Sequence, residues 1–432
     1  MEKIFKKLLR LKSIPLKSTG QSMLPILRPN DIVYFKKTPF LKIKVNDLII
    51  FKKKNQLITH RVIYKTKKYL ITKGDNNLNF DGKIYPKQIL GKVYQIRRNG
   101  QIFKPETLYL IQSTYYFSEI VKIKNEFDKK NINYVFLKGL PLHLYFEGKH
   151  PQRLYADCDV LIDKKDFQKA EEILLKNHYQ KVEFYWSKTA KKLQKKELEA
   201  NFYKKNNQFV VAFDIHLQLV DLSIVHLGHF NELYPQKLID DLTEEFLKTK
   251  RKIKITNEKF LILNTYYLIL YLSLHLFHHN FSGAFRYDFL DKVIKKSKIS
   301  IKSWQEIALI IKKYQLNNFV FPVFFLLRKY YQSPIPKNFF KKIQPKTLNN
   351  FYTIFTLPFT QHSHRVRRGL HKINIFNDEP RFHAGINRFK NLFLLSPSPF
   401  WKKLLIFFNP QVIFAVFWVV WKKIKKLFLD LN

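Results

Sequence analysis

Hydrophobic and polar residues alternate in short runs over the first hundred positions of the chain. Alternation with a period of two is typical of half-buried β-strands, and glycine, proline and asparagine turns separate the runs. The runs that show it are residues 31–35, 46–51, 57–64, 67–75 and 89–96. We therefore predict a small, mostly β domain over residues 1–103.

The pattern changes at about residue 105, where hydrophobic positions take the spacing of an amphipathic helix that extends to about residue 130. Shorter segments of both kinds follow, with strands at 133–139, 154–162 and 209–219 and helices at 141–149 and 164–178. That order predicts an α/β core over residues 104–235. Residues 236–432 are rich in aromatic side chains and predict mainly helices. We expect an α+β multidomain protein.

Both ends of the chain carry apolar segments that are poor membrane spans. The first twenty residues mix basic and apolar side chains and lack the uninterrupted apolar core of a secretory signal or a span. Residues 404–421 carry no charge, and Trp401 and Trp421 would be interfacial anchors if this segment crossed a bilayer. Asn409 and Pro410 interrupt it, so we favour a buried or surface-docked helix.

The composition excludes two classes of protein. With 46% hydrophobic residues the 432-residue chain can bury a core, which excludes wholesale disorder. Its one cysteine, Cys158, excludes a disulfide framework and indicates a reducing compartment. A net charge of +45 points to nucleic acid or an anionic membrane surface as partner. Lys, Asn, Ile and Phe are all abundant, which favours a genome-wide drift in amino-acid composition over nucleic-acid binding as the origin of this charge.

Three residues of the β domain have the chemistry of a serine hydrolase. Ser22 lies in a turn between Gly20 and Met23, where backbone N–H groups would be free to form an oxyanion hole. His60 could take the proton of the serine, and Asp81 could orient the histidine. The ordinary alternative for His60 is a core histidine, because it shares a strand face with apolar residues.

The ordered motifs carry a resemblance to a known family. They are Gly20-Gln21-Ser22-Met23-Leu24-Pro25, then His60-Arg61-Val62, then Thr72-Lys73-Gly74-Asp75-Asn76-Asn77 followed by Asp81. This set resembles the catalytic region of type I signal peptidases, in the branch that uses histidine as the base, over about residues 15–98. The resemblance implies that Ser22 is the nucleophile, His60 the base and Asp81 the orienting acid, with Asp75 a second carboxylate nearby. Asn30 and Asn46 stand where that family usually has glycine, and we expect its N-terminal membrane anchor to be missing.

Paired carboxylates mark the second half of the chain. Strand periodicity puts Asp157 and Asp159 on one face of the strand 154–162, with Cys158 buried on the other, and it gives Asp214 a similar place on the strand 209–219. Three neighbouring carboxylates repel one another unless a cation lies among them, and Mg²⁺ prefers oxygen ligands. The alternative is a solvated strand face. His275, His278 and His279 share a helix face, for which we favour packing over metal binding.

The sequence around these carboxylates resembles the nucleotidyltransferase superfamily of the DNA polymerase β type, and most closely its poorly characterised bacterial family. The matching residues are Leu137-Lys138-Gly139 before a helix, Arg153 before Asp157 and Asp159, and Asp214-Ile215-His216. The resemblance covers roughly residues 105–400 and implies that Asp157, Asp159 and Asp214 bind Mg²⁺. It places Lys138 and Gly139 at the glycine motif that contacts the nucleotide phosphates, and it makes Arg153 a phosphate clamp. The superfamily often has Gly-Ser or Gly-Gly in place of Lys-Gly.

These resemblances together predict a fusion of a cofactor-free serine endopeptidase, acting on a peptide or preprotein, with a Mg²⁺-dependent nucleotidyltransferase. The second module would transfer a nucleoside monophosphate from a nucleoside triphosphate to an acceptor. Because no span separates the modules, both are expected on one side, in the cytoplasm or on the cytoplasmic face of a membrane. The alternative is that one or both modules are inactive and act as a binding scaffold in the export or maturation of a peptide or polysaccharide.

Overall fold

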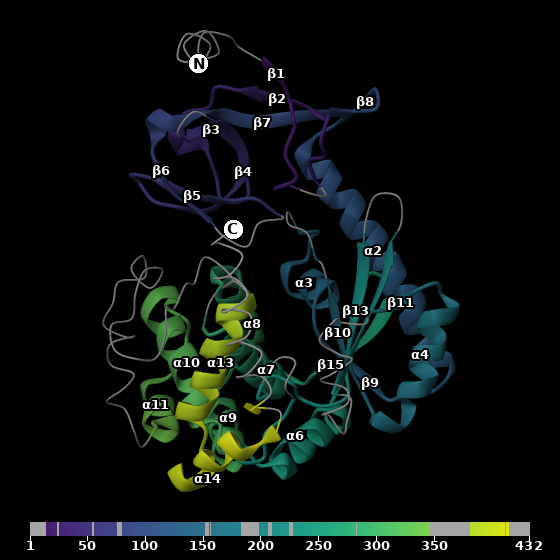
Figure 1. Ribbon diagram of the computed structural model, residues 1–432, viewed down its shortest axis with the longest axis vertical. Coiled ribbons are helices and arrows are strands. Elements are labelled where there is room, and N and C mark those ends of the chain that lie inside the picture. The colour runs from purple at the N-terminus through teal and green to yellow at the C-terminus, as the bar shows by residue number, and fades with distance from the viewer. Residues whose placement is uncertain are drawn as a thin grey trace, which may run out of the picture.

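Two β-sheets and a helical region form the protein, in a computed structural model (Figure 1). The α+β architecture agrees with the expectation from the sequence. The structure describes residues 14–23, 26–53, 56–75, 80–151, 155, 157–182, 198–205, 210–223, 228–281, 283–345, 381–410 and 412–413.

The first sheet is antiparallel throughout and lies at the upper end of Figure 1. Its strands are β1 (Ile14–Lys17), β2 (Ile32–Lys36), β3 (Leu48–Lys53), β4 (Gln56–Lys65), β5 (Leu70–Lys73), β6 (Phe80–Ile84), β7 (Ile89–Arg98) and β8 (Gln101–Phe103). They run in the order β1-β2-β7-β3-β4-β5-β6, with β8 paired to β7. Alternate residues enter two hydrophobic clusters, as period two requires.

Two turns of this sheet have an asparagine in a backbone conformation that favours glycine. Asn30 and Asn46 have φ angles of 74° and 75°, in the left-handed region. Glycine adopts that region freely, and asparagine is among the few other residues that tolerate it. Asparagine can therefore occupy both turns. The aspartates that follow stay in place: the carboxylate of Asp31 accepts from the Arg28 N–H at 2.8 Å and pairs with Arg98 at 2.7 Å.

The second sheet is mixed. Its strands are β9 (Tyr134–Lys138), β10 (Cys158–Ile162), β11 (Gln180–Lys181), β12 (Glu199–Lys205), β13 (Val210–His216), β14 (Arg251–Ile255) and β15 (Glu258–Ile262). They run in the order β11-β12-β13-β10-β9-β15-β14, with the pairs β10–β13 and β9–β15 parallel. Strand β10 begins at Cys158, after the described residues Tyr155 and Asp157 of the predicted strand 154–162; residues 154 and 156 lie outside the described residues. Every residue of β10 is buried, because helices cover both faces of the sheet.

Helices make up most of the rest of the described chain. They are α2 (Pro105–Lys129), α3 (Leu140–Glu147), α4 (Phe167–Lys176), α6 (Gln236–Lys248), α7 (Thr265–His278), α8 (Ala284–Ser297), α9 (Ile301–Lys313), α10 (Asn317–Tyr331), α11 (Lys337–Ile343), α13 (Arg381–Leu395) and α14 (Phe400–Leu404), which the 3-10 turn η4 (Leu405–Phe408) continues. Among the residues described, no helix is long and apolar enough to cross a membrane. Residue 411 and residues 414–421, half of the segment considered above as a span, lie outside the described residues.

Helix α2 belongs to the packing of both sheets. Near its start Tyr109 is buried in a cluster of the first sheet, and the Arg61 guanidinium lies 4.3 Å from the centre of its ring. Farther along, Tyr116, Ile120 and Phe127 are buried in the large core of the second sheet. One continuous helix therefore connects the two cores (Figure 1).

Candidate active sites

The sheet register brings three charged residues into one row across the middle of the second sheet. Asp159 on β10 pairs with Lys138 on β9 on one side and with Asp214 on β13 on the other. Directly opposed residues project to the same face of a sheet, so their side chains meet. Asp157, just before β10, joins them. One oxygen of each of the three carboxylates lies within 4.8 Å of the others, close enough to share a metal ion.

Lys138 is the cation of this cluster. Its ammonium contacts the Asp159 carboxylate and lies 3.4 Å from Oδ2 of Asp157. Burial alone would lower the pKa of Lys138, but attraction to Asp157 and Asp159 outweighs it and raises the pKa above the usual value. Lys138 is therefore a permanent positive charge among the acids.

The carboxylates differ in their affinity for protons. Burial would raise the pKa of Asp159, but Lys138 and His216 lower it to about 2. For Asp214, burial, followed by repulsion from Asp159 and Asp157, outweighs the attraction of Lys138 and His216 and raises its pKa to about 8. Once Asp214 loses its proton, the three carboxylates have one more negative charge than Lys138 and His216 neutralise, a balance that favours binding of a further cation.

His216 also belongs to this site, although the sequence indicated it only as part of the motif Asp214-Ile215-His216. It lies two residues after Asp214, and its Nε2 is 3.1 Å from Oδ1 of Asp159. Burial lowers the pKa of His216, but the hydrogen bond and charge of Asp159 raise it overall to about 9. His216 thus holds Asp159 in position. The alternation Asp-x-His on one strand was the signal, because it puts both side chains on the same face.

Gly139 lies where β9 turns into α3, beside the carboxylates. Its φ of 106° is in the region that side-chain-bearing residues rarely adopt, and a Cβ there would come within 3.3 Å of the Asp157 carbonyl oxygen. The glycine lets the start of α3 approach the three carboxylates closely. Cys158 is buried as expected. Arg153, the predicted phosphate clamp, lies outside the described residues.

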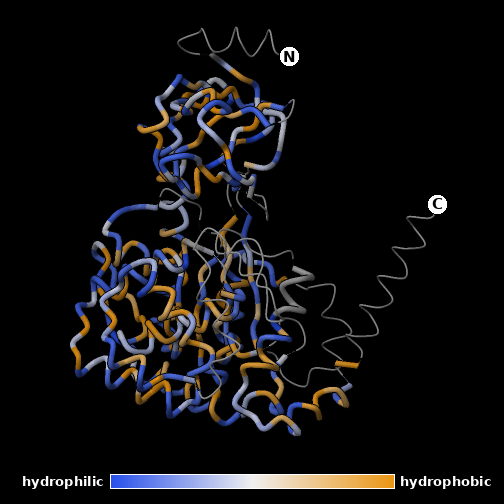
Figure 2. The backbone as a smooth tube through the Cα atoms, turned by 90° about the vertical axis from the view of Figure 1, so that its left-hand side faces the viewer, coloured by the Kyte–Doolittle hydropathy of each residue, from blue (hydrophilic) through white to orange (hydrophobic). Residues whose placement is uncertain are grey.

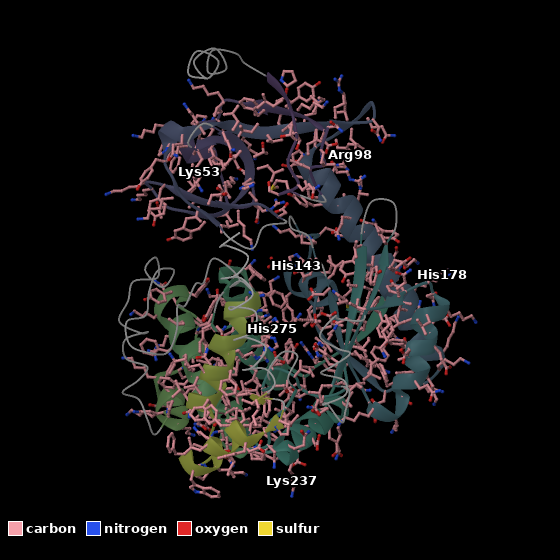
Figure 3. The ribbon with its side chains drawn as sticks, viewed as in Figure 1. Lys53, Arg98, His143, His178, Lys237 and His275 are labelled. Atoms are coloured by element: carbon pink, nitrogen blue, oxygen red, sulfur yellow. The ribbon has the colours of Figure 1, made fainter. Side chains whose placement is uncertain are left out.

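A second buried polar group lies between α7 and the second sheet, where Figure 3 labels His275. Asp221 Oδ1 is 3.3 Å from Nδ1 of His275 and 3.6 Å from Nδ1 of His278. The guanidinium of Arg388 donates to the carbonyl oxygens of Val220 and Asp221. Burial lowers the pKa of both histidines well below the usual value and raises that of Asp221 to about 6. The histidines are therefore neutral polar groups packed against a carboxylate.

In the first sheet, Ser22, His60 and Asp81 form a connected chain of hydrogen bonds. Ser22 Oγ lies 2.8 Å from Nε2 of His60, and Nδ1 of His60 lies 2.6 Å from Oδ2 of Asp81. His60 is on β4 and Asp81 on β6. Between them on β5, Thr72 donates to the same Asp81 oxygen at 2.7 Å. The order serine, histidine, aspartate is the arrangement in which a histidine can take the serine proton.

The structure gives the other predicted residues of this site different surroundings. The carboxylate of Asp75 accepts from both Nε and Nη2 of Arg61, next to His60 in sequence. Met23 is buried, and its sulfur accepts a hydrogen bond from the Asp75 N–H at 3.4 Å. Gly20 has open space where a Cβ would lie. Met23, Asp75 and Arg61 thus tie the serine turn to β4.

Comparison with known proteins identifies the larger part of the chain. The model of a family described as "uncharacterised nucleotidyltransferase" matches residues 107–332, more than half of the sequence. The chain belongs to this family. Membership supports a nucleotidyl-transfer activity, with a nucleoside triphosphate and an acceptor as substrates. No curated protein and no solved structure matches the chain.

Proposed function

We propose that the second sheet carries a Mg²⁺-dependent nucleotidyltransferase site, in which Asp157, Asp159 and Asp214 hold the metal. The carboxylate cluster supports this function best, because it supplies three oxygen ligands within 4.8 Å of one another inside the matched family region. Oxygen-only ligands suit Mg²⁺. When bound, Mg²⁺ would neutralise phosphate charge and align the phosphates of a nucleoside triphosphate.

The protein's own residues then have separate tasks. His216 fixes the orientation of Asp159 through the hydrogen bond to Oδ1. Lys138 supplies a positive charge beside the carboxylates, where a phosphate oxygen would approach. Gly139 keeps the entrance to α3 free of side-chain atoms. Asp214, with its raised pKa, is the carboxylate that must lose a proton before it can act as a ligand.

Mg²⁺ affinity is expected to depend on pH through Asp214. Below its pKa of about 8 this carboxyl is protonated and competes with the metal, so affinity should rise between about pH 6 and 9 and binding near pH 7 should release a proton. Calorimetric titration with Mg²⁺ in two buffers of different ionisation enthalpy measures that release. An affinity that stays constant from pH 6 to pH 9 would contradict the prediction.

Nucleotide binding tests the site itself. Each of the four ribonucleoside triphosphates, in a non-hydrolysable form, is titrated into the full chain with and without Mg²⁺. We expect Mg²⁺-dependent binding that Asp157→Asn weakens by more than ~10-fold, since loss of a direct ligand costs at least as much as loss of an outer-shell partner. The matched control is Asp240→Asn, at a half-exposed carboxylate on α6. Equal binding by wild type and Asp157→Asn would refute this assignment and favour a scaffold.

The triad of the first sheet favours a second function, that of a serine endopeptidase of the signal peptidase type. In this proposal Ser22 attacks a peptide carbonyl while His60 accepts the serine proton and returns it to the leaving amine. Asp81, held by Thr72, keeps Nδ1 of His60 protonated and Nε2 facing Ser22. The contacts of 2.8 Å and 2.6 Å are the observations that support it.

A fluorophosphonate probe tests this second function without knowledge of the peptide. Such probes react with activated serines, so we expect one adduct, which mass spectrometry of the digested protein would map to Ser22. Ser22→Ala should abolish the adduct, whereas Ser118→Ala, at an exposed hydroxyl on α2, should not change it. Absence of an adduct on the folded wild type, or labelling that survives in Ser22→Ala, would sink the serine mechanism.

A further inference from the structure

The segment formed by α14 and η4 has its apolar side turned outward. Trp401, Leu404, Leu405 and Phe408 follow the i, i+3, i+4, i+7 spacing of one helix face, and their exposed fractions are 67%, 40%, 48% and 78%. The opposite face, with Lys403 and Ile406, is buried. This is the reverse of an ordinary surface helix, in which the lysine would face water.

Neighbouring aromatic rings widen this surface. Phe393 on α13 lies 6.4 Å from Phe400 and 5.8 Å from Phe407, ring centre to ring centre, and both partners are exposed. Eight of the twenty large hydrophobic side chains exposed in the described residues fall between Leu394 and Ile413. We call the exposed side chains of this segment the aromatic patch: Phe400, Trp401, Leu404, Leu405, Phe407 and Phe408. A contiguous apolar surface of this kind marks a binding face.

The location of the patch leaves room for a large partner. Helix α14 lies at the lower end of the molecule in Figure 1, away from the first sheet, and Figure 2 shows hydrophobic colour along much of the segment at the lower right. The carboxylate cluster lies in the second sheet, between these two ends. Occupation of the patch would therefore leave both candidate active sites uncovered.

The charge of the surrounding sequence indicates the partner. From Arg381 to Leu429 the chain has no aspartate or glutamate. Besides the buried Arg388 and Lys403 it has seven basic residues there: Arg381, Lys390, Lys402, Lys422, Lys423, Lys425 and Lys426. Tryptophan and phenylalanine beside lysines are typical of segments that lie in the headgroup region of a bilayer. Apolar contact and attraction to negative headgroups then act together.

We infer that the aromatic patch docks the protein onto the surface of an anionic lipid bilayer, with Trp401 and Phe408 inserted among the headgroups. The inference is independent of the proposed activities, because it uses none of their residues. It also accounts for the buried Lys403: its ammonium lies 3.5 Å from the carbonyl oxygen of Leu394, on the protein side of the segment. Contact of the apolar side with water is unfavourable, and an apolar partner that covers it removes this cost.

Vesicle co-sedimentation of the full chain tests this inference. Vesicles of equal parts phosphatidylcholine and phosphatidylglycerol should bind the wild type, and vesicles of phosphatidylcholine alone should bind it at least tenfold more weakly. The double variant Trp401→Ser, Phe408→Ser should lose at least tenfold in partitioning to the anionic vesicles. The matched control is Leu41→Ser, Ile301→Ser, which removes two side chains that are 82% and 71% exposed elsewhere. Circular dichroism of all variants establishes that they are folded.

Three results would overturn the inference. Equal binding of the patch variant and the wild type would assign membrane attraction to charge elsewhere on the molecule. Equal binding to neutral and anionic vesicles would remove the role of the lysines. No binding to either vesicle would mean that another apolar partner covers the patch. Sedimentation velocity would identify that partner as a second copy of the chain if the wild type formed a dimer and the patch variant did not.

Discussion

Asp81→Asn is expected to slow the reaction of Ser22 with a fluorophosphonate by about 10⁴-fold at neutral pH, the cost of the corresponding change in a serine protease. The physical reason is the tautomer of His60. The Asp81 carboxylate accepts from Nδ1 of His60 and from Thr72, so Nε2 stays unprotonated toward Ser22. An amide at position 81 can donate to Nδ1, which moves the proton to Nε2 and removes the base.

Asp75→Asn is the matched control for this prediction, because Asp75 is the second carboxylate in the same group of motifs as Asp81. Asp75 contacts Arg61, so we expect its loss to lower stability and to change the labelling rate by less than ~10-fold once both variants are assayed well below their unfolding temperatures. The quantity to measure is the second-order rate constant for adduct formation. A larger loss in Asp75→Asn than in Asp81→Asn would transfer the orienting role to Asp75.

Lys138→Met is expected to change metal and nucleotide affinity in opposite directions. In the absence of nucleotide, the Lys138 ammonium contacts the carboxylates that would bind Mg²⁺, so the variant should bind the ion more tightly. The expected gain is at least ~5-fold, because two unit charges about 4 Å apart interact by ~1 kcal/mol even at the dielectric constant of water, and by more in a buried site. The nucleotide should bind the variant more weakly, because its phosphates lose a positive charge.

Electron paramagnetic resonance of Mn²⁺, used in place of Mg²⁺, measures the free ion directly and needs no turnover. Lys124→Met is the matched control: Lys124 is also buried between two carboxylates, 3.0 Å from Asp128 and 3.5 Å from Glu258, but outside the site. It should leave Mn²⁺ affinity unchanged. Weaker Mn²⁺ binding in Lys138→Met would show that the lysine helps to build the metal site instead of competing with the ion.

The sequence was most informative where chemistry depends on local order. Period two put Asp157 and Asp159 on the polar side of Cys158. Contacts among Ser22, His60 and Asp81 were expected only from the resemblance of their motifs to those of signal peptidases. Local spacing also predicted α2 to within a residue of its end at Lys129. The face of a strand and the length of a helix depend on the local repeat of the backbone, which neighbouring residues determine.

Contacts between distant strands were harder to foresee. The contact between Lys138 and Asp159 depends on the register of β9 against β10. The contact between Asp75 and Arg61 depends on the register of β4 against β5. A shift of one residue turns every side chain to the other face, and no local pattern specifies the shift. The start of β10 was predicted too early for another reason: the residues before Cys158 match the strand pattern as well as those after it.

Helix α2 limits how the two candidate sites can cooperate. Its 25 residues span about 37 Å, and its one proline is at the first position, where it does not bend a helix. Sharp kinks need an internal proline, a glycine or a bulge, and α2 has no glycine. A helix without these features and anchored in both cores resists hinge motion. Any molecule processed at Ser22 and then modified near Asp159 would have to travel between the sites by diffusion, since this connection is too stiff to act as a swinging arm.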